Sequence, residues 1–252
     1  MRFSIITPSL NSKSTIKDCI ESVKNQTFKD IEHIIVDGKS TDGTLDIINK
    51  YAANKNCYKV IVICERDKGI YDALNKGIKI SSGDIIGILH SDDFFAESST
   101  LEKINKKFNE NNCDGVYGNI EYVSVDNPNK TIRYWNADSY SLGKFKYGWH
   151  PPHTSLFLKR MVFEKYGLYR TDLTIASDYE AMLRYIHKYG IKLAYLPEVL
   201  VKMRLGGASN KSIKNLIITT IEDYKAWKLN GLKGGLQAVI LKKLRKLPQF
   251  FK

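Results

Sequence analysis

The sequence lacks the features that mark several common classes of protein. It contains no run of about 18 apolar residues, so we expect no membrane-spanning helix. A strand-like segment begins directly after Met1 and Arg2, so we expect no signal peptide and a cytoplasmic protein. The cysteines form no CxxC pair, which argues against a zinc or dithiol site. We expect them to be reduced residues of the core: Cys19, Cys57, Cys64 and Cys113.

The loops that commonly bind phosphates are also missing. Neither a GxGxxG fingerprint nor a Walker loop is present. A phosphorylated ligand would therefore need a metal ion to meet its charge.

Acidic residues are the minority charge. Among 252 residues, 39 are Lys or Arg and 27 are Asp or Glu, so the formal net charge is +12. This excess favours an anionic partner, whether a nucleic acid, a phosphorylated substrate or an anionic membrane, although a lysine-rich solvated surface explains it equally well. The apolar fraction of 43% and the charged fraction of 26% exclude a collagen-like, disordered or disulfide-stapled chain.

The first 90 residues alternate between strand-like and helix-like segments. Short apolar runs predict the strands, and apolar residues at i, i+3, i+4 and i+7 predict the helices. This alternation favours βαβ units, and therefore an α/β fold with a mostly parallel sheet flanked by helices. The predicted strands are 2–7, 31–37, 59–64 and 85–89, and the predicted helix faces lie within 16–23, 45–51 and 70–78.

The pattern changes after about residue 115. We expect one domain over residues 1–209, divided into halves at about 1–115 and 116–209, and a helical, basic tail over residues 210–252. In the second half, strands are predicted at 116–123, 153–158 and 193–204, a helix at 177–189, and an irregular aromatic stretch at 134–149.

Polar side chains follow each of the first four predicted strands. Ligands of open α/β sheets bind beyond the carboxyl ends of the strands, so these residues are candidates for a site. Turn chemistry explains part of the pattern, because Asp, Ser and Gly suit loops. The segments concerned are 7–11, 37–42, 65–69 and 90–93.

Asp92 and Asp93 directly follow a predicted buried strand. Mg²⁺ is commonly held by one or two carboxylates together with substrate phosphates, and Mn²⁺ accepts the same ligands. The pair therefore predicts a Mn²⁺ or Mg²⁺ site, the alternative being an Asx turn that closes the strand.

Several segments, in order, resemble the family-2 glycosyltransferases with the GT-A (Rossmann-like) fold. The resemblance extends from Arg2 to about Ser209 and is closest to the subgroup that builds bacterial surface polysaccharides such as O-antigen and capsule. Gly38 departs from the pattern, since many members carry a second Asp there. The segments are SIITPSLN at 4–11, IIVDGKSTDGT at 34–44, and ERDKGIYDALNKGIKISSGDIIGILHSDD at 65–93, which ends in the SDD motif.

The resemblance implies a nucleotide-sugar site, commonly for a UDP-sugar. Thr7, Pro8 and Asn11 would border the nucleotide, and Asp37 would hydrogen-bond the base.

The same resemblance implies roles for the later strand ends. Asp67 and the Gly69 turn would close the nucleotide pocket. Asp92 would face the ribose or the metal, and Asp93 would bind the metal that bridges the diphosphate. Lys76 would help to neutralise the phosphates, unless it is a solvated lysine of a helix.

The segment SDYE at 177–180 reads as a capping box, with Ser177 as N-cap and Glu180 at N3. Asp178 would then lie in the first turn, where the helix dipole favours a carboxylate. By itself this placement is explained by helix stabilisation, but the resemblance puts the catalytic Asp of the family at this motif. It implies that Asp178 is the general base of an inverting hexosyl transfer, a role typically worth about 10²–10⁴-fold.

Two further cationic or titratable residues are candidates for the acceptor or the diphosphate. His153, in WHPPHT, has no suitably spaced metal-ligand partners and is either a loop histidine or a contact for the acceptor or a phosphate. Arg204, before Gly206 and Gly207, would place a cation over the diphosphate or simply end a strand.

The tail LKKLRKLPQFFK at 241–252 carries five cations and no acid beside apolar residues. Such a segment favours peripheral attachment to an anionic membrane, here the cytoplasmic face of the inner membrane, the alternative being a solvated tail. It also suits a lipid-diphosphate-linked saccharide as the acceptor.

Two other functions remain open at this point. A sugar-phosphate nucleotidyltransferase would also use a metal and such a sheet, but it usually carries a Gly-rich basic signature near the first strand, which TPSLNSKS lacks. A nucleic-acid-binding protein would need a basic groove with exposed aromatics. The acidic strand ends oppose it, so no nucleic-acid partner is expected.

Overall fold

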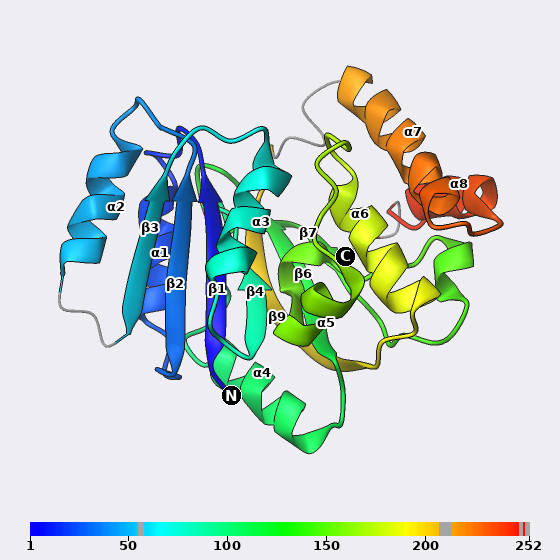
Figure 1. Ribbon diagram of the computed structural model, residues 1–252, viewed down its shortest axis with the longest axis horizontal. Coiled ribbons are helices and arrows are strands. Elements are labelled where there is room, and N and C mark those ends of the chain that lie inside the picture. Colours follow the sequence, from blue (N-terminus) through cyan, green and yellow to red (C-terminus); the bar gives the residue numbers. More distant parts are fainter. Residues whose placement is uncertain (55–57, 207–212, 247–248, 250–252) are drawn as a thin grey trace.

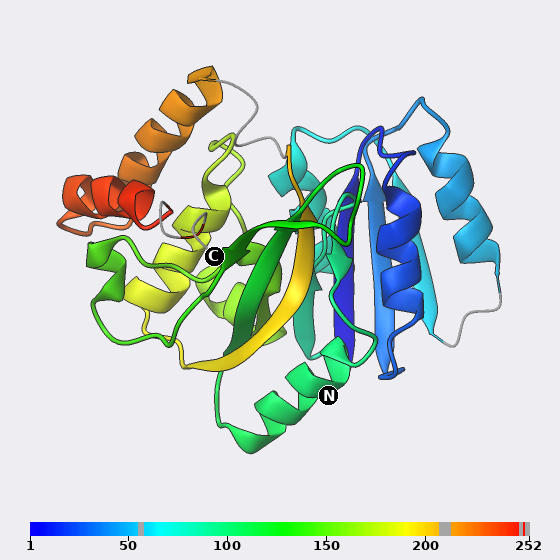
Figure 2. The same ribbon diagram turned by 180° about the vertical axis from the view of Figure 1, so that it is seen from behind.

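The computed structural model describes residues 1–54, 58–206, 213–246 and 249. A curled nine-stranded sheet forms its centre (Figure 1). The strand order is β3-β2-β1-β4-β8-β6-β9-β5, and β7 pairs with β6 beside this path. Helices cover the sheet on both sides, as the opposite view in Figure 2 also shows. The architecture confirms the predicted α/β fold class.

The first half of the chain forms the parallel part of the sheet. β1 pairs in parallel with β2 and β4, and β2 with β3. Both β1 and β2 are buried along their whole length, because helices cover both faces. The elements are β1 (Phe3–Ser9), α1 (Ile16–Lys24), β2 (Ile31–Asp37), α2 (Thr44–Ala53), β3 (Lys59–Cys64), α3 (Ile70–Ile80) and β4 (Ile85–Ile88).

The cysteines divide into two groups. Cys19 and Cys113 are buried, as expected, and both are free thiols. Cys64 is exposed because β3 ends there at the edge of the sheet, so its assignment to the core was wrong. Cys57 lies outside the described residues.

The second half is mixed rather than parallel. β8 runs antiparallel to β4 and β6, while β9 runs parallel to β6. Part of the aromatic stretch at 134–149 is core, since Phe145 and Trp149 are buried and in edge-to-face contact, whereas Tyr147 is exposed. The elements are β5 (Phe94–Phe95), α4 (Thr100–Glu110), β6 (Gly115–Val123), β7 (Thr131–Trp135), the 3-10 helices η1 (Lys144–Tyr147) and η2 (His153–Ser155), β8 (Leu156–Lys159), α5 (Arg160–Tyr166), α6 (Ser177–Met182), its π-helical continuation η3 (Leu183–Lys188), and β9 (Leu193–Arg204).

Two further helices, α7 (Ile213–Leu229) and α8 (Gly235–Leu244), form what we name the C-terminal hairpin. It packs beside α6 and η1, at the end of the molecule away from α2 (Figure 1). The contact with η1 is so close that a Cβ built on Gly148 would lie 2.2 Å from the backbone nitrogen of Lys242. The backbone of α8 therefore packs directly against the backbone at the end of η1.

Among the described helices, none combines the length and the hydropathy needed to cross a bilayer. Gly207, the predicted boundary at 209/210, and residues 247, 248 and 250–252 of the predicted tail lie outside the described residues.

Candidate active site

The carboxyl ends of β1, β2, β3 and β4 form one continuous edge, which we name the rim. The Gly38 amide donates to the Ser9 carbonyl (2.8 Å), and the Glu65 amide donates to the Asp37 carbonyl (3.0 Å). The hydroxyls of Ser12 and Ser91 are 2.7 Å apart and join the loops after β1 and β4. The structure thus brings together the four polar strand ends that the sequence indicated.

Asp37 ends β2 inside the rim. Its side chain is buried, and its carboxylate accepts hydrogen bonds from the Ser40 amide (2.8 Å) and the Ser40 hydroxyl (2.6 Å). Asp37 is therefore fixed by a local turn, with its orientation set before any ligand arrives.

Asp67 lies against Gly38, the residue that follows Asp37. A Cβ built on Gly38 would approach an Asp67 carboxylate oxygen to 3.3 Å, so a larger residue there would crowd Asp67. Gly69, with φ of 115°, makes the turn into α3 that follows.

Lys76 reaches this turn from α3. Its ammonium contacts the carboxylates of Asp67 (2.6 Å), Glu65 (2.8 Å) and Asp72 (3.3 Å). The bonds to Asp67 and Glu65 raise the pKa of Lys76 above its usual value. Its charge is already met by these three carboxylates, so it supports the 65–69 turn and is not a free cation for a phosphate.

The residues after β1 are placed differently from one another. Thr7 is buried and hydrogen-bonds His33 (2.9 Å), whose pKa burial lowers to about 3. The Thr7 hydroxyl therefore faces the interior, towards His33 and Cys19 of α1, and is not presented at the rim. Pro8 is buried opposite Val36, whereas Asn11 is exposed, with φ of 50°, and accepts from the Thr41 amide (2.9 Å). Of the three, Asn11 offers a side chain to the surface.

The strongest sign of a ligand-binding position is at Asp93. Its side chain is 1% exposed, and neither carboxylate oxygen has a hydrogen-bond partner among the described residues. Burial and the neighbouring Asp92 raise its pKa well above the usual value, and Arg204 offsets only part of this. A buried carboxylate without partners is costly unless it neutralises or holds a cation.

The surroundings of Asp93 fit a divalent cation that is completed by a ligand. Within the described ranges, no group of three or more His, Cys, Asp or Glu side chains could hold a metal on its own. Asp92 and Asp93 supply the one or two carboxylates that Mg²⁺ or Mn²⁺ uses when phosphates complete its shell.

Arg204, at the end of β9, holds the Asp92–Asp93 segment in place. Its guanidinium donates to the Asp92 carbonyl (2.8 Å), pairs with Asp18 and lies 5.1 Å from the centre of the Phe94 ring. Arg204 is 6% exposed, so a direct contact with a diphosphate would require it to leave these partners.

Asp178, in the first turn of α6, lies near α3 and near the residues that follow β4. The Tyr71 hydroxyl, on α3, lies 3.2 Å from the Asp178 carboxylate and 2.5 Å from the Ile175 carbonyl. The rings of His90 and His153 are 6.1 Å apart, and the charge of Asp178 acts on both. Burial lowers the pKa of His153 to about 4, so this imidazole is neutral at pH 7.

The predicted capping box at α6 is wrong, and a distant residue takes its place. Ala176 precedes the helix, the Ser177 hydroxyl has no partner among the described residues, and Glu180 pairs with Arg184. The carboxylate of Glu222, on α7, accepts the amides of residues 174, 175 and 176 at 2.8–2.9 Å. Glu222 thus fixes the backbone that leads to Asp178, and nothing near Asp178 in the sequence signals this.

The sequence also has relatives with assigned activities. The family model for glycosyl transferase family 2 matches residues 4–167. The chain is 30% identical over 210 residues to a PGL/p-HBAD biosynthesis glycosyltransferase of Mycobacterium bovis, which covers 82% of this chain and 79% of that protein. These findings favour the glycosyltransferase over the nucleotidyltransferase interpretation.

Two solved structures share the fold. S. aureus TarS 1–349 in complex with UDP-GlcNAc has a TM-score of 0.65 at 18% identity, covering 97% of this chain and 72% of that one. The mannosyltransferase PcManGT from Pyrobaculum calidifontis, in complex with GDP-Man and Mn²⁺, has a TM-score of 0.63 at 18% identity, covering 98% and 75%. With its rim of strand-end carboxylates and its matching motifs, the chain belongs to glycosyl transferase family 2 and has the GT-A fold.

Proposed function

We propose that this glycosyltransferase moves a sugar from a nucleotide-sugar, first of all a UDP-sugar, to a hydroxyl of a lipid-linked surface saccharide, with a divalent cation and with inversion at the anomeric carbon. The observation that carries the proposal is the partnerless Asp93 carboxylate beside Asp92, in a site that Asp178 shares. Two proteins of the same fold bind UDP-GlcNAc and GDP-Man with Mn²⁺, which supports a nucleotide-sugar donor.

In this proposal the rim holds the donor. Asp37 faces the base, Asn11 and the buried backbone of Thr7 and Pro8 border the nucleotide, and Asp67 with the Gly69 turn closes the pocket. Asp92 faces the ribose or the metal, and Asp93 holds the metal. Residues 1–115 are then the donor half, and residues 116–209 are the acceptor half.

A Mn²⁺ or Mg²⁺ ion held by Asp93 and Asp92 would supply positive charge to the departing diphosphate. Asp178 takes the proton of the acceptor hydroxyl, whose oxygen attacks the anomeric carbon opposite the leaving group. The Tyr71 hydroxyl, whose shorter hydrogen bond goes to the Ile175 carbonyl, lies 3.2 Å from the Asp178 carboxylate and limits its orientation. Because His153 is neutral at pH 7, Asp178 faces no competing cation from that side.

A panel of UDP-sugars and GDP-sugars, assayed for nucleotide release with Mn²⁺, Mg²⁺ or EDTA, tests the proposal. We expect release with one donor, its loss in EDTA, and its return with either metal. Full turnover in EDTA would contradict the metal assignment. Anomer analysis of the product by NMR decides between inversion and retention.

We also propose that the C-terminal hairpin attaches the enzyme to an anionic membrane. In residues 213–246 both acids, Glu222 and Asp223, are buried, so every exposed charge is positive. Exposed apolar side chains lie beside these cations, a combination that suits an interfacial surface. The exposed apolar residues are Leu216, Ile217, Ile221, Tyr224, Leu229, Leu236, Ile240 and Leu244.

Lys242 corrects the simpler interpretation of the tail as a row of surface cations. Its ammonium lies 2.7 Å from the Asp223 carboxylate, and both side chains are buried. A deletion from Leu241 would leave Asp223 unpaired. Membrane attachment is therefore tested with surface substitutions.

Sedimentation with phosphatidylglycerol vesicles at low and high salt tests the attachment. We expect Ile221→Gln/Ile240→Gln to bind much less than the wild type, and the control Ile80→Gln/Val125→Gln, also exposed, to bind equally. Salt should weaken binding, because exposed charges are screened over about 8 Å at physiological ionic strength. Equal sedimentation of the hairpin variant and the control would contradict the proposal.

A further inference from the structure

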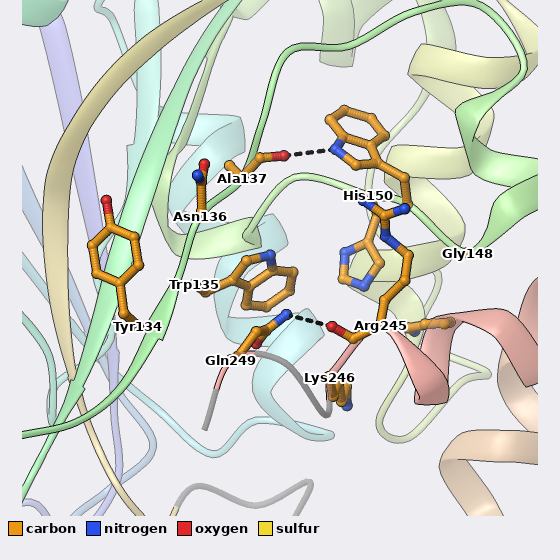
Figure 3. A pocket seen from close by; sticks show the side chains of 11 residues that line it. Tyr134, Trp135, Asn136, Ala137, Gly148, His150, Arg245, Lys246 and Gln249 are labelled. Carbon is orange, nitrogen blue, oxygen red and sulfur yellow. Dashed lines mark hydrogen bonds between the residues drawn. The ribbon is translucent and has the colours of Figure 1, made fainter. Parts of the chain in front are cut away.

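A cavity of about 380 Å³ lies between the C-terminal hairpin and β7, outside the rim. Figure 3 shows its walls: aromatic side chains from β7 and the segment after η1 on one side, and the end of α8 on the other. The residues that line it include Trp135, His150, Lys242, Arg245, Lys246 and Gln249.

Positive charge in this cavity exceeds the negative charge that could balance it. Lys242 is already paired with Asp223, and neither Arg245 nor Lys246 forms an ion pair with any residue that the structure describes. His150 adds no negative charge, and its pKa is lowered well below the usual value by burial and then by Lys242. The charge of Arg245 also reaches Asp138, but that carboxylate pairs with Lys144. Arg245 and Lys246, which directly follow α8, are thus left for a ligand.

The charges also act on one another. Burial, followed by repulsion from Lys242 and Arg133, lowers the pKa of Lys246 to about 8. The acids that face Lys246 are Asp223 and Asp178, and they offset only part of this effect. An anion in the cavity would relieve the repulsion and hold Lys246 in its charged form.

The cavity adjoins the helix of the proposed base. Tyr179, the residue after Asp178, packs against His150 with ring centres 5.5 Å apart, and the Lys242 ammonium lies 3.7 Å from the centre of the Tyr179 ring. A group bound at Arg245 and Lys246 would therefore lie between α6 and the C-terminal hairpin, where the charge of Asp178 already acts on Lys246.

We infer that this cavity is a subsite for a phosphate group of the acceptor, bound by Arg245 and Lys246. The inference rests on the proposed function and names the chemistry of its acceptor: a saccharide whose hydroxyl reaches Asp178 while its phosphate is held by Arg245 and Lys246. Arg presents a fork of donors that matches phosphate oxygens, and Lys adds a point charge. Trp135, which meets His150 edge-to-face at 5.1 Å, forms a wall beside the phosphate.

Binding measured by calorimetry tests the subsite without requiring catalysis. The donor site is first saturated with UDP and Mg²⁺, so that added phosphate compounds cannot bind there. The probes are farnesyl diphosphate for a lipid diphosphate and glycerol 1-phosphate for a polyol phosphate, with farnesol and glycerol as uncharged counterparts. The probe that binds more tightly identifies the source of the phosphate.

Two double variants separate the subsite from general charge. Arg245→Gln/Lys246→Gln removes the two unpaired cations of the cavity. Lys228→Gln/Lys233→Gln removes the same charge from exposed positions of the same hairpin outside the cavity. We expect the first to weaken binding of a phosphate probe about tenfold or more, and the second to bind it like the wild type.

Equal binding by the wild type and Arg245→Gln/Lys246→Gln, or no binding of either phosphate probe, would overturn the inference. Thermal melting of both variants confirms that they are folded. UDP affinity, measured in the same experiment, reports on the proposed donor site separately. If the donor proposal is wrong, UDP will not bind. Binding of the phosphate probes can then be measured on protein without metal or UDP, so the two proposals are tested separately.

Discussion

The rim and the surroundings of Asp178 are built in different ways. In the rim, residues close in the sequence hold two of the carboxylates: Ser40 holds Asp37 from three positions away, and Lys76 holds Asp67 from nine. Asp178 is held by Tyr71, which is 107 positions away, and its backbone is fixed by Glu222, which is 46 to 48 positions from the amides it accepts. A site of the first kind is visible as motifs, whereas a site of the second kind exists only once the chain has folded.

The two regions also differ in charge. Carboxylates line the rim, and Asp93 has no partner among the described residues, so this region calls for a cation. On the hairpin side, Arg245 and Lys246 form no ion pair with the residues that the structure describes, so that region favours an anion. An enzyme that joins a metal-bound donor to an anionic acceptor would need carboxylates on the donor side and cations on the acceptor side.

The largest effect is expected from Asp178→Asn. It removes the proposed base while keeping the size of the side chain, so turnover should fall by about 10²–10⁴-fold. Initial rates at saturating donor measure it. The control Asp172→Asn changes an exposed carboxylate of the preceding loop, which pairs with Arg170, and should stay close to the wild type. Near-normal turnover of Asp178→Asn would place the base elsewhere.

Asp93→Asn should lower turnover by about 10²-fold or more, since a bound metal supplies several kcal/mol of charge stabilisation. The same change should raise the unfolding free energy of the metal-free protein by about 1 kcal/mol or more, because it removes a partnerless buried charge. Differential scanning calorimetry with and without Mn²⁺ tests this. Mn²⁺ should raise the melting temperature of the wild type and leave that of the variant unchanged.

The pH dependence of this difference follows from the raised pKa of Asp93. A carboxyl whose pKa is raised on folding destabilises the folded state when the pH is above its unfolded pKa, and the cost disappears as the pH falls to that value. The stability advantage of Asp93→Asn should therefore shrink as the pH is lowered from 8 towards the ordinary carboxyl range. An advantage that grew on acidification would contradict the assignment of a costly charge to Asp93.

Lys242→Met tests whether the hairpin is part of the folded body. It leaves Asp223 buried and unpaired, which costs about 3–5 kcal/mol. Urea unfolding measures the loss, and Lys243→Met, at an exposed position next to it, serves as the control. Equal stabilities of the two variants would show that the hairpin is loosely attached.

Glu222→Gln is expected to have the smallest effect. The neutral amide keeps an acceptor for the loop before α6 but loses charge-assisted bonds, so we expect about a tenfold lower kcat and an unchanged KM for the donor. A lower affinity for the donor would show that Glu222 does not act through the placement of Asp178. Glu110→Gln, on the exposed end of α4, is the matched control.

The same contrast explains what the sequence predicts. Strands 31–37 and 59–64 were predicted to the residue, because β-branched apolar runs between turn residues leave little choice. The capping box at Ser177 failed because Glu222 supplies the partners that a local cap would supply. Thr7 and Lys76 were expected at the donor, and the structure adds contacts that the sequence did not indicate. Thr7 bonds His33, 26 positions away, and Lys76 contacts Glu65 and Asp67 in addition to Asp72, its i,i+4 partner on α3.

The division between the two regions is tested most directly by the affinity for UDP with Mn²⁺, measured by calorimetry on four proteins: the wild type, Asp93→Asn, Asp178→Asn and Arg245→Gln/Lys246→Gln. If the rim alone holds the donor, Asp93→Asn should bind UDP about tenfold or more weakly, while the other two variants bind it as the wild type does. If Asp178→Asn or Arg245→Gln/Lys246→Gln weakened UDP binding as much as Asp93→Asn, the donor and acceptor sides would share residues, which would contradict the separation of the two regions.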